Sequence, residues 1–259
     1  MLLAIDIGNT QTHLGLFDGE ELLEHWRFAS VREATADELA ALFTSLLAMR
    51  GLRWDAVDDA IVSSVVPQLA LEYEQVSERY LDGRLATVGP ALRSGMPIRM
   101  DSPHEVGSDR LVNAVAAYER WQSACVVVDF GTSTNFDVVS DEGEYVGGVL
   151  CPGVEISMEA LFQRAAKLTK VEIEAPRTVI GKNTRAALQS GIVHGSASLV
   201  DGIVTRVREE LGQPARAIAT GGLAQTITPF CEQIDEVDDM LTLTGLRLVW
   251  ERNRQMRAH

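Results

Sequence analysis

The chain has 259 residues, 46% of them hydrophobic, and a formal net charge of −14. This length suits two domains of ordinary size or one large one, and the apolar content supports packed cores rather than disorder. The acidic balance disfavours nonspecific nucleic-acid binding, which needs a basic face. No apolar run approaches the roughly 20 residues of a membrane span. The three cysteines have no Cys-x-x-Cys spacing, which favours a reducing, cytoplasmic setting over a disulfide framework or a zinc site.

The first part of the chain predicts a mixed sheet with helices on its faces. An apolar strand runs into the turn Asp6-Ile7-Gly8-Asn9-Thr10, and strands and a further turn follow it. A capping box at residues 35–38 begins a helix, and Leu39, Leu42 and Phe43 recur at helical spacing. A strand at 60–66, a helix to about 80 and a short strand at 85–88 complete an α/β pattern.

The same order then repeats. Residues 89–109 are predicted to form a loop, and a helix follows from residue 109 or 110 to 121. A second apolar strand leads into Asp129-Phe130-Gly131-Thr132, with hairpin strands to about residue 150. The pattern continues with a helical stretch at 183–211, a strand at 215–219, the turn Thr220-Gly221-Gly222 and a closing helix at 242–254. Such self-similarity indicates duplication, with domains at residues 1–118 and 119–259.

The two Asp-x-Gly turns have the chemistry of phosphate-binding loops. Glycine lets the backbone bend and its N–H groups approach a bulky anion. A carboxylate repels phosphate directly, so Asp6 and Asp129 make sense if a cation stands between them and the anion. Nearby hydroxyls would add neutral donors, and they belong to Thr10, Thr12, Thr132 and Thr134. Two such hairpins facing each other across a cleft would clasp a nucleoside triphosphate, although one copy alone is equally compatible with a plain hairpin turn.

The doubled turns resemble the phosphate-binding loops of the acetate kinase, sugar kinase, Hsp70 and actin superfamily. Further motifs, in order over essentially the whole chain, are similar to the type III pantothenate kinases. They are Asp6–Thr10, Glu105–Arg110, Asp129–Thr132, Gly147-Gly148 through Pro152-Gly153, Ile180–Thr184, Gln189–Ile192, Thr220–Gly222 and Leu241–Leu246. The resemblance implies two duplicated ribonuclease-H-like, actin-like ATPase domains with the active site in the interdomain cleft.

The resemblance also implies a reaction and its partners. The reaction is ATP-dependent phosphorylation of pantothenate to 4′-phosphopantothenate, the first step towards coenzyme A. It implies Mg²⁺, a monovalent cation (K⁺ or NH₄⁺), and a homodimer in which pantothenate lies close to the subunit interface.

Roles carry over from the resemblance residue by residue. The ATP phosphates are expected on the loop of Asp6, Ile7, Gly8, Asn9, Thr10, Gln11, Thr12 and His13. Asp6 is expected near Mg²⁺, Thr132 against ATP, and Asp129 on the monovalent cation. The pantothenate pocket is expected to include Met100, Gly107, Ser108, Asp109, Arg110 and Thr184.

Asp109 is the candidate general base, because a carboxylate within about 3 Å of an alcohol can accept its proton. Its alternative role is to cap the helix, since Asp is a favoured N-cap. Arg110 offers a fork of donors suited to a carboxylate such as pantothenate's own. Met100 stands where the family often has Tyr, so the phenol hydroxyl is missing there. Gly221 is either part of a strand-to-helix turn or a point of close approach to adenosine.

Two other functions stay open at this level. One is a non-catalytic accessory factor of transcription of the same family, which retention of the acidic and threonine site residues disfavours. The other is a superfamily kinase acting on another small alcohol, which the motifs at 107–110 and 181–184 disfavour.

Overall fold

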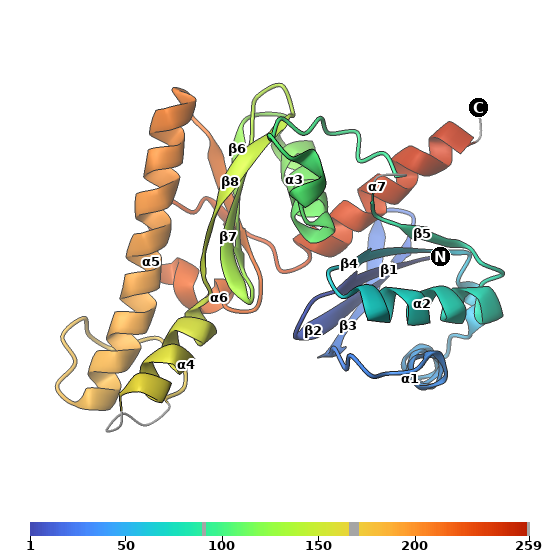
Figure 1. Cartoon of the computed structure of the whole chain (residues 1–259), viewed down its shortest axis with the longest axis horizontal. Helices are drawn as coiled ribbons and strands as arrows, with labels where there is room; N and C mark the ends of the chain where they lie inside the picture. Colours follow the sequence, from blue (N-terminus) through green and yellow to red (C-terminus); the bar gives the residue numbers. More distant parts are fainter. Residues whose placement is uncertain (90–91, 166–170, 258–259) are drawn as a thin grey trace. The chain divides into compact units, whose positions relative to one another are not determined.

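The computed structural model describes residues 1–89, 92–165 and 171–257, which form two compact units (Figure 1). The first unit comprises the described residues of Met1–Met96, Ser102–Ala116 and Thr242–His259. The second comprises Pro97–Asp101 and Ala117–Leu241. Within the described ranges, no helix is both long enough and apolar enough to cross a bilayer.

The first unit is built on a five-stranded sheet in the order β3-β2-β1-β4-β5. Its strands are β1 (Leu2–Ile7), β2 (Gln11–Asp18), β3 (Glu21–Ala29), β4 (Asp59–Ser64) and β5 (Leu85–Thr87). The first three strands form antiparallel hairpins, whereas β4 pairs with β1 and β5 pairs with β4 in parallel. This mixed sheet is the one that the order of predicted elements indicated.

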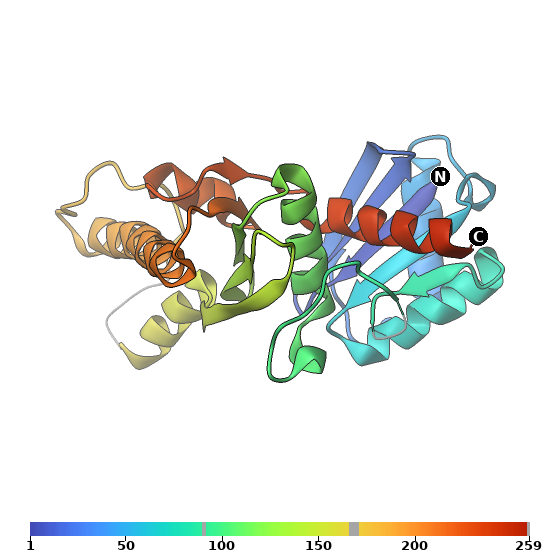
Figure 2. The ribbon, with the colours of Figure 1, turned by 90° about the horizontal axis from the view of Figure 1, so that it is seen from above.

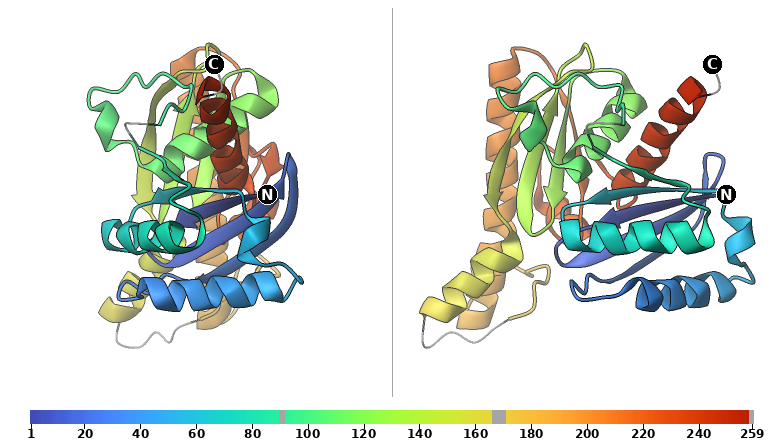
Figure 3. Two further views of the ribbon diagram at one scale, coloured as in Figure 1. Left: turned by 90° about the vertical axis from the view of Figure 1, so that its right-hand side faces the viewer. Right: turned by 45° about the vertical axis from the view of Figure 1, so that its right-hand side comes forward.

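Helices cover both faces of the first sheet. They are α1 (Ala36–Ala48), α2 (Pro67–Tyr80), α3 (Ser108–Trp121), which extends into the second unit, and α7 (Leu241–Arg257), with 3₁₀ turns η1 (Trp54–Ala56) and η2 (Pro103–Glu105). Figure 3 shows α1 and α2 side by side along one face, where Phe43 and Leu69 pack against Ile5 and other buried strand residues. The predicted capping box is present, since Thr35 and Glu38 bond each other's backbone N–H.

The last helix belongs to the first unit, although chain order placed residues 242–259 in the second domain. Figure 2 shows α7 lying across the strands of the first sheet. The Arg247 guanidinium lies 5.9 Å from the centre of the Phe17 ring. The Asn253 side chain accepts from the Arg93 N–H at 3.1 Å and donates to its carbonyl at 2.8 Å. These contacts join residues more than 150 positions apart, so local sequence patterns could not reveal them.

The second unit repeats the topology of the first. Its sheet has the order β10-β9-β6-β7-β8. The strands are β6 (Cys125–Phe130), β7 (Ser133–Val139), β8 (Tyr145–Pro152), β9 (Arg216–Thr220) and β10 (Glu236–Val237). Again the first three form antiparallel hairpins, while β9 joins β6 and β10 joins β9 in parallel. The duplication inferred from the two turns is therefore present in both strand order and strand direction.

One long helix covers much of the sheet of the second unit. The helical elements are α4 (Val154–Arg164), α5 (Thr184–Leu211), α6 (Ala224–Ile227) and η3 (Thr228–Phe230). Val193, Val200 and Val204 of α5 are fully buried against Val126 and Val128 of β6. Asn183 caps the start of α5, and its end is a left-handed glycine at position 212.

Candidate active site

The first Asp-x-Gly turn joins β1 to β2 in the first unit. The Gly8 N–H donates to the carbonyl of Gln11 at 3.1 Å, which closes a tight hairpin. Asn9, Thr10 and Gln11 are exposed at its tip, and Asp6 is half-buried at its base. The turn therefore presents short polar side chains and backbone to solvent, as a phosphate-binding loop requires.

Three members of the predicted loop direct their side chains elsewhere. Ile7 is fully buried in the core. Thr12 is 1% exposed, and its hydroxyl lies 2.9 Å from that of Ser30. His13 is buried with its Nε2 3.5 Å from Nδ1 of His25. These three side chains therefore take part in packing and local hydrogen bonds. The prediction that the Thr12 hydroxyl faces phosphate was wrong, because that hydroxyl is buried beside Ser30.

The His13 imidazole is a neutral group. Burial, together with the nearby positive charges of Arg27 and His25, lowers its pKa from 6.5 to about 4. An uncharged ring beside the turn adds no positive charge for binding phosphate.

The start of α3 lies at the same end of the first sheet as this turn. Asp6 is the strand neighbour of Ser63 in the parallel pairing of β1 with β4. The Ser63 hydroxyl lies 2.9 Å from that of Ser108, the first residue of α3. Asp109 follows directly and is half-buried. The first unit thus brings the candidate general base to the strand ends that carry the turn.

Asp109 does not occupy the capping position. The first backbone bond of α3 runs from the Leu111 N–H to the carbonyl of Gly107 at 3.0 Å, which makes Gly107 the N-cap. One carboxylate oxygen of Asp109 accepts from the Arg110 N–H at 2.9 Å. A carboxylate in the first turn also gains from the partial positive charge of the helix N-terminus.

The second Asp-x-Gly turn joins β6 to β7 in the second unit. The Gly131 N–H donates to the carbonyl of Ser133 at 3.0 Å, so the second turn is closed by its glycine as the first is but is one residue shorter. Thr132 is exposed, and Asp129 is half-buried at the base. Asp129 lies beside Thr220 in the parallel pairing of β6 with β9, as Asp6 lies beside Ser63. The two aspartates therefore hold equivalent places in the two units.

Two glycines distant in sequence pack directly on the second turn. A Cβ on Gly153 would overlap the Thr132 carbonyl oxygen and lie 2.7 Å from its carbonyl carbon. Gly221 has a φ of +93°, and a Cβ there would lie 2.5 Å from Oδ1 of Asp129. Both glycines permit a close approach that an alanine would block. Their motifs were visible in the sequence, but their contact with the turn was not.

Met100 and Thr184 lie on separate elements of the second unit. Met100 is half-buried and follows residues 97–99, which are hydrogen-bonded to the first residue of β8. The Tyr145 N–H donates to the Pro97 carbonyl at 2.8 Å, and the Tyr145 carbonyl accepts from the Arg99 N–H at 2.8 Å. Thr184 is exposed as the first residue of α5. Met100 and the segment 107–110 belong to different units.

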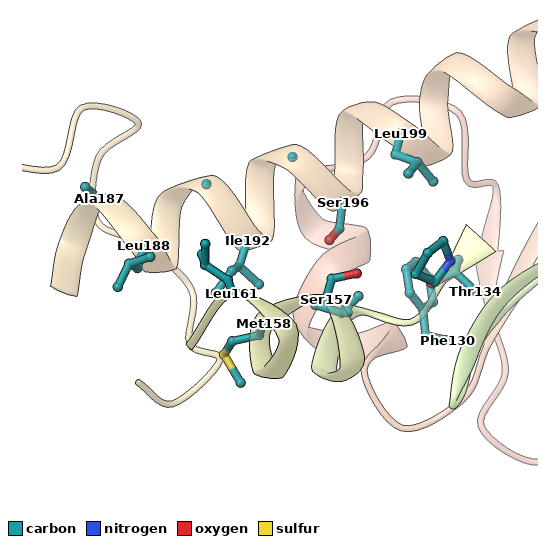
Figure 4. A pocket seen from close by; sticks show the side chains of 14 residues that line it. Phe130, Thr134, Ser157, Met158, Leu161, Ala187, Leu188, Ile192, Ser196 and Leu199 are labelled. Carbon is teal, nitrogen blue, oxygen red and sulfur yellow. The ribbon is translucent and has the colours of Figure 1, made fainter. Parts of the chain in front are cut away.

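A cavity of about 340 Å³ lies within the second unit between α4, α5 and the ends of β6 and β7 (Figure 4). Its walls are mainly apolar and include Met158 and Leu161 of α4 and Ile192 and Leu199 of α5, with Leu161 close to Ile192. Thr134, one of the predicted phosphate donors, lines this cavity and is buried, whereas Thr132 and Asp129 are not among the lining residues. The cavity adjoins the second turn only through the flanking residues Phe130 and Thr134, and its apolar walls do not suit phosphate.

The carboxylates of Asp6 and Asp129 suit cations that take their remaining ligands from substrate phosphates and water. In the part of the chain that the structure describes, no three His, Cys, Asp or Glu side chains gather as a metal site. Mg²⁺ is commonly bound by one or two carboxylates together with substrate phosphates and water, and Asp6 suits that mode. At Asp129, the backbone of Gly221 packs directly on the carboxylate, since a Cβ there would lie 2.5 Å from Oδ1.

Comparison with known proteins identifies the family. The model of the family described as type III pantothenate kinase matches residues 2–206. The chain belongs to the type III pantothenate kinase family. The type III pantothenate kinase of Anaeromyxobacter sp. (strain K) is 52% identical over 254 residues, which cover 98% of this chain and 100% of that protein. The Myxococcus xanthus (strain DK1622) member of the family is 51% identical over 253 residues, 98% and 99% of the two chains.

Solved structures show the actin-like ATPase and sugar-kinase fold. A Campylobacter jejuni protein described as a Baf family transcriptional activator has a TM-score of 0.61 at 16% identity, covering 98% of this chain and 99% of its own. Component A of (R)-2-hydroxyglutaryl-CoA dehydratase from Acidaminococcus fermentans has a TM-score of 0.58 at 16% identity, covering 100% and 99%. The predicted fold of two ribonuclease-H-like halves is thereby confirmed.

Proposed function

We propose that this protein transfers the γ-phosphoryl group of ATP to the primary hydroxyl of pantothenate and so catalyses the first step towards coenzyme A. Similarity to type III pantothenate kinases along 98% of the chain supports the reaction. The observation that carries the chemistry is the link from Asp6 through the Ser63–Ser108 hydrogen bond to Asp109. It brings a phosphate-type turn and a carboxylate base to one end of one sheet.

In this proposal Asp109 accepts the hydroxyl proton of pantothenate as the oxygen attacks the γ-phosphorus. Phosphoryl transfer needs an aligned alcohol and a neutralised phosphate more than covalent help. Asp109 lies in the first turn of α3, where a carboxylate interacts favourably with the partial positive charge of the helix N-terminus. Arg110 binds the pantothenate carboxylate, since a guanidinium matches a carboxylate with two parallel hydrogen bonds. Met100, Gly107, Ser108 and Thr184 complete the pantothenate pocket.

We propose that both turns act on the same ATP. The exposed tip Asn9–Gln11 and the backbone of Gly8 bind phosphate oxygens, and Thr132 donates to the nucleotide from the second turn. Ile7, Thr12 and His13 contribute through their backbone, because their side chains are buried. When bound, Mg²⁺ near Asp6 and K⁺ or NH₄⁺ near Asp129 supply positive charge that offsets the phosphates.

A homodimer is part of the proposal. Large apolar side chains are exposed on β8, α4 and α5 of the second unit, including Leu150 at 66% and Ile156 at 46%. A partner subunit that covered these side chains would remove apolar surface from water. We place the protein in the cytoplasm, where its three free cysteines stay reduced.

A coupled assay of ADP release tests the function. The full chain is incubated with ATP, Mg²⁺ and K⁺, and with pantothenate, a panel of sugars or no acceptor. Pantothenate-dependent ADP release, with 4′-phosphopantothenate identified by mass spectrometry, is the expected result. Turnover on a sugar alone would identify a kinase for another alcohol. No ADP release with any acceptor, despite ATP binding, would instead favour a non-catalytic role.

A further inference from the structure

A second cavity lies in the first unit, beside the first turn, because the N–H of its lining residue Ser30 donates to the Thr10 carbonyl at 2.9 Å. It has a volume of about 330 Å³ and is bounded by the ends of β2 and β3 and by α1 and α2. Leu39, Leu42 and Leu69 form its apolar part. A cavity of roughly 150 Å³ in a protein core can hold benzene, so this space is large enough for a substituted ring.

One end of this cavity is polar and incompletely bonded. The Tyr73 side chain is 2% exposed and lines the cavity, and its hydroxyl has no hydrogen-bond partner of ordinary geometry. It lies near the Thr12 hydroxyl, which pairs with Ser30 at 2.9 Å. Because two hydroxyls that bond each other use one of their two hydrogens, that pair has a second donor to offer. A buried donor without an acceptor is costly, and an acceptor placed here would remove that cost.

The charge at the mouth of the cavity selects against anions. Glu33 and Glu38 both contribute to its lining. Glu38 also accepts from Thr35 in the capping box, which lowers the pKa of its carboxyl and keeps it ionised. Burial raises the pKa of Tyr73, so its hydroxyl stays protonated and can donate a hydrogen bond. The negative charge disfavours an anion, and the apolar walls disfavour a cation, which would lose its hydration there. The complementary molecule is therefore neutral, with one acceptor at its deep end.

We propose that this cavity is a binding site for a compact neutral molecule with an aromatic or branched aliphatic body and one carbonyl oxygen. The body packs against Leu39, Leu42 and Leu69, and the carbonyl accepts from the Tyr73 hydroxyl. The site lies beside the first turn and shares Thr12 with the loop proposed to bind ATP, but it takes a different ligand on a different set of side chains.

Two probes of equal size separate this proposal from simple apolar binding. Acetophenone carries the carbonyl, and ethylbenzene lacks it. Binding to the full chain is followed by chemical-shift titration without nucleotide, so the outcome does not depend on the proposed reaction. Acetophenone is expected to bind saturably and about tenfold more tightly than ethylbenzene.

Two variants then locate the binding. Tyr73→Phe keeps the ring and is expected to reduce acetophenone affinity to that of ethylbenzene, with ethylbenzene unchanged. Leu42→Trp fills the cavity and should abolish binding of both probes, whereas Leu71→Trp, at a position 59% exposed on α2, should change neither. Absence of saturable binding, or acetophenone affinity that Tyr73→Phe leaves unaltered, overturns the proposal. Because Tyr73→Phe is nearly isosteric, it keeps the test valid if Leu42→Trp fails to fold.

Discussion

Replacing Gly153 with alanine tests whether the second turn depends on close packing from the start of α4. Gly153 precedes Val154, the first residue of that helix. An added methyl group would overlap the Thr132 carbonyl oxygen and lie 2.9 Å from that of Gly131. All of these atoms are backbone, so no side chain can rotate away to make room.

The size of the effect follows from this geometry. Ordinary contacts between carbon atoms begin near 3.5 Å, so Thr132 and residue 153 must separate by about 1 Å. Overpacking of this kind costs about 1–3 kcal/mol, and the rigid surroundings place the expected loss of unfolding free energy near the upper end. If Thr132 contacts ATP, a displacement of about 1 Å should also lower kcat/KM for ATP by about 10²-fold.

Urea unfolding and ATP-dependent kinetics, measured on the same preparations, check both expectations. Gly202→Ala is the matched control, because it lies inside α5 and its added Cβ meets only the flexible Arg206 guanidinium at 3.1 Å. That control should gain up to about 1 kcal/mol from helix propensity and keep full activity. Wild-type stability and kinetics in Gly153→Ala would refute the packing argument. Lost stability with normal ATP kinetics would remove Thr132 from the nucleotide site.

Three further predictions address the site. Asp109→Asn should lower kcat by about 10²-fold or more and leave ATP affinity unchanged. The control Asp55→Asn changes an exposed carboxylate of the same unit and should have no effect. Similar turnover in the two variants would contradict the role of Asp109 as base. Activity should require K⁺ or NH₄⁺ and fade in Na⁺ alone, and Asp129→Asn should lose that dependence; equal rates in all three salts argue against a cation at Asp129. Because burial and nearby positive charge lower the pKa of His13 from 6.5 to about 4, the unfolded chain binds its proton more tightly, and the free energy of unfolding must fall as pH falls from about 6.5 to 4. His13 should lower the free energy of unfolding by about 2 kcal/mol between pH 7 and pH 5. In urea unfolding, His13→Asn should lack that part of the pH dependence. If the free energy of unfolding falls equally with pH in the wild type and the variant, the imidazole of His13 is not buried and neutral.

Much of the fold could be predicted because its signals are local. The capping box at Thr35 and Glu38, the helical spacing of Leu39 and Phe43, and the Pro67 that begins α2 each lie within a few residues of the element they specify. The two-residue strand β10 and the single turn of α6 were missed, since elements this short show no periodicity.

The site was predicted at the level of segments but not of side-chain directions. The positions of both turns and the start of α3 follow from glycines and strand ends, which sequence shows directly. Whether Thr12 faces outward depends on its pairing with Ser30, 18 residues away. The contacts of Gly153 with Thr132 and of Gly221 with Asp129 require the packing of β8 and β9 around β6 and β7, which no local pattern encodes.

The return of the last helix to the first unit has a consequence for biosynthesis. Residues 117–241 form most of the second unit without interruption, whereas the first unit needs Leu243, Leu246 and Val249 of α7, all fully buried. Domains generally fold as they leave the ribosome, the N-terminal one first. Here the N-terminal half must wait for α7, so the apolar surface that α7 covers stays bare until that helix has been made. A nonsense codon ahead of the segment that encodes α7 would therefore damage the unit that is made first.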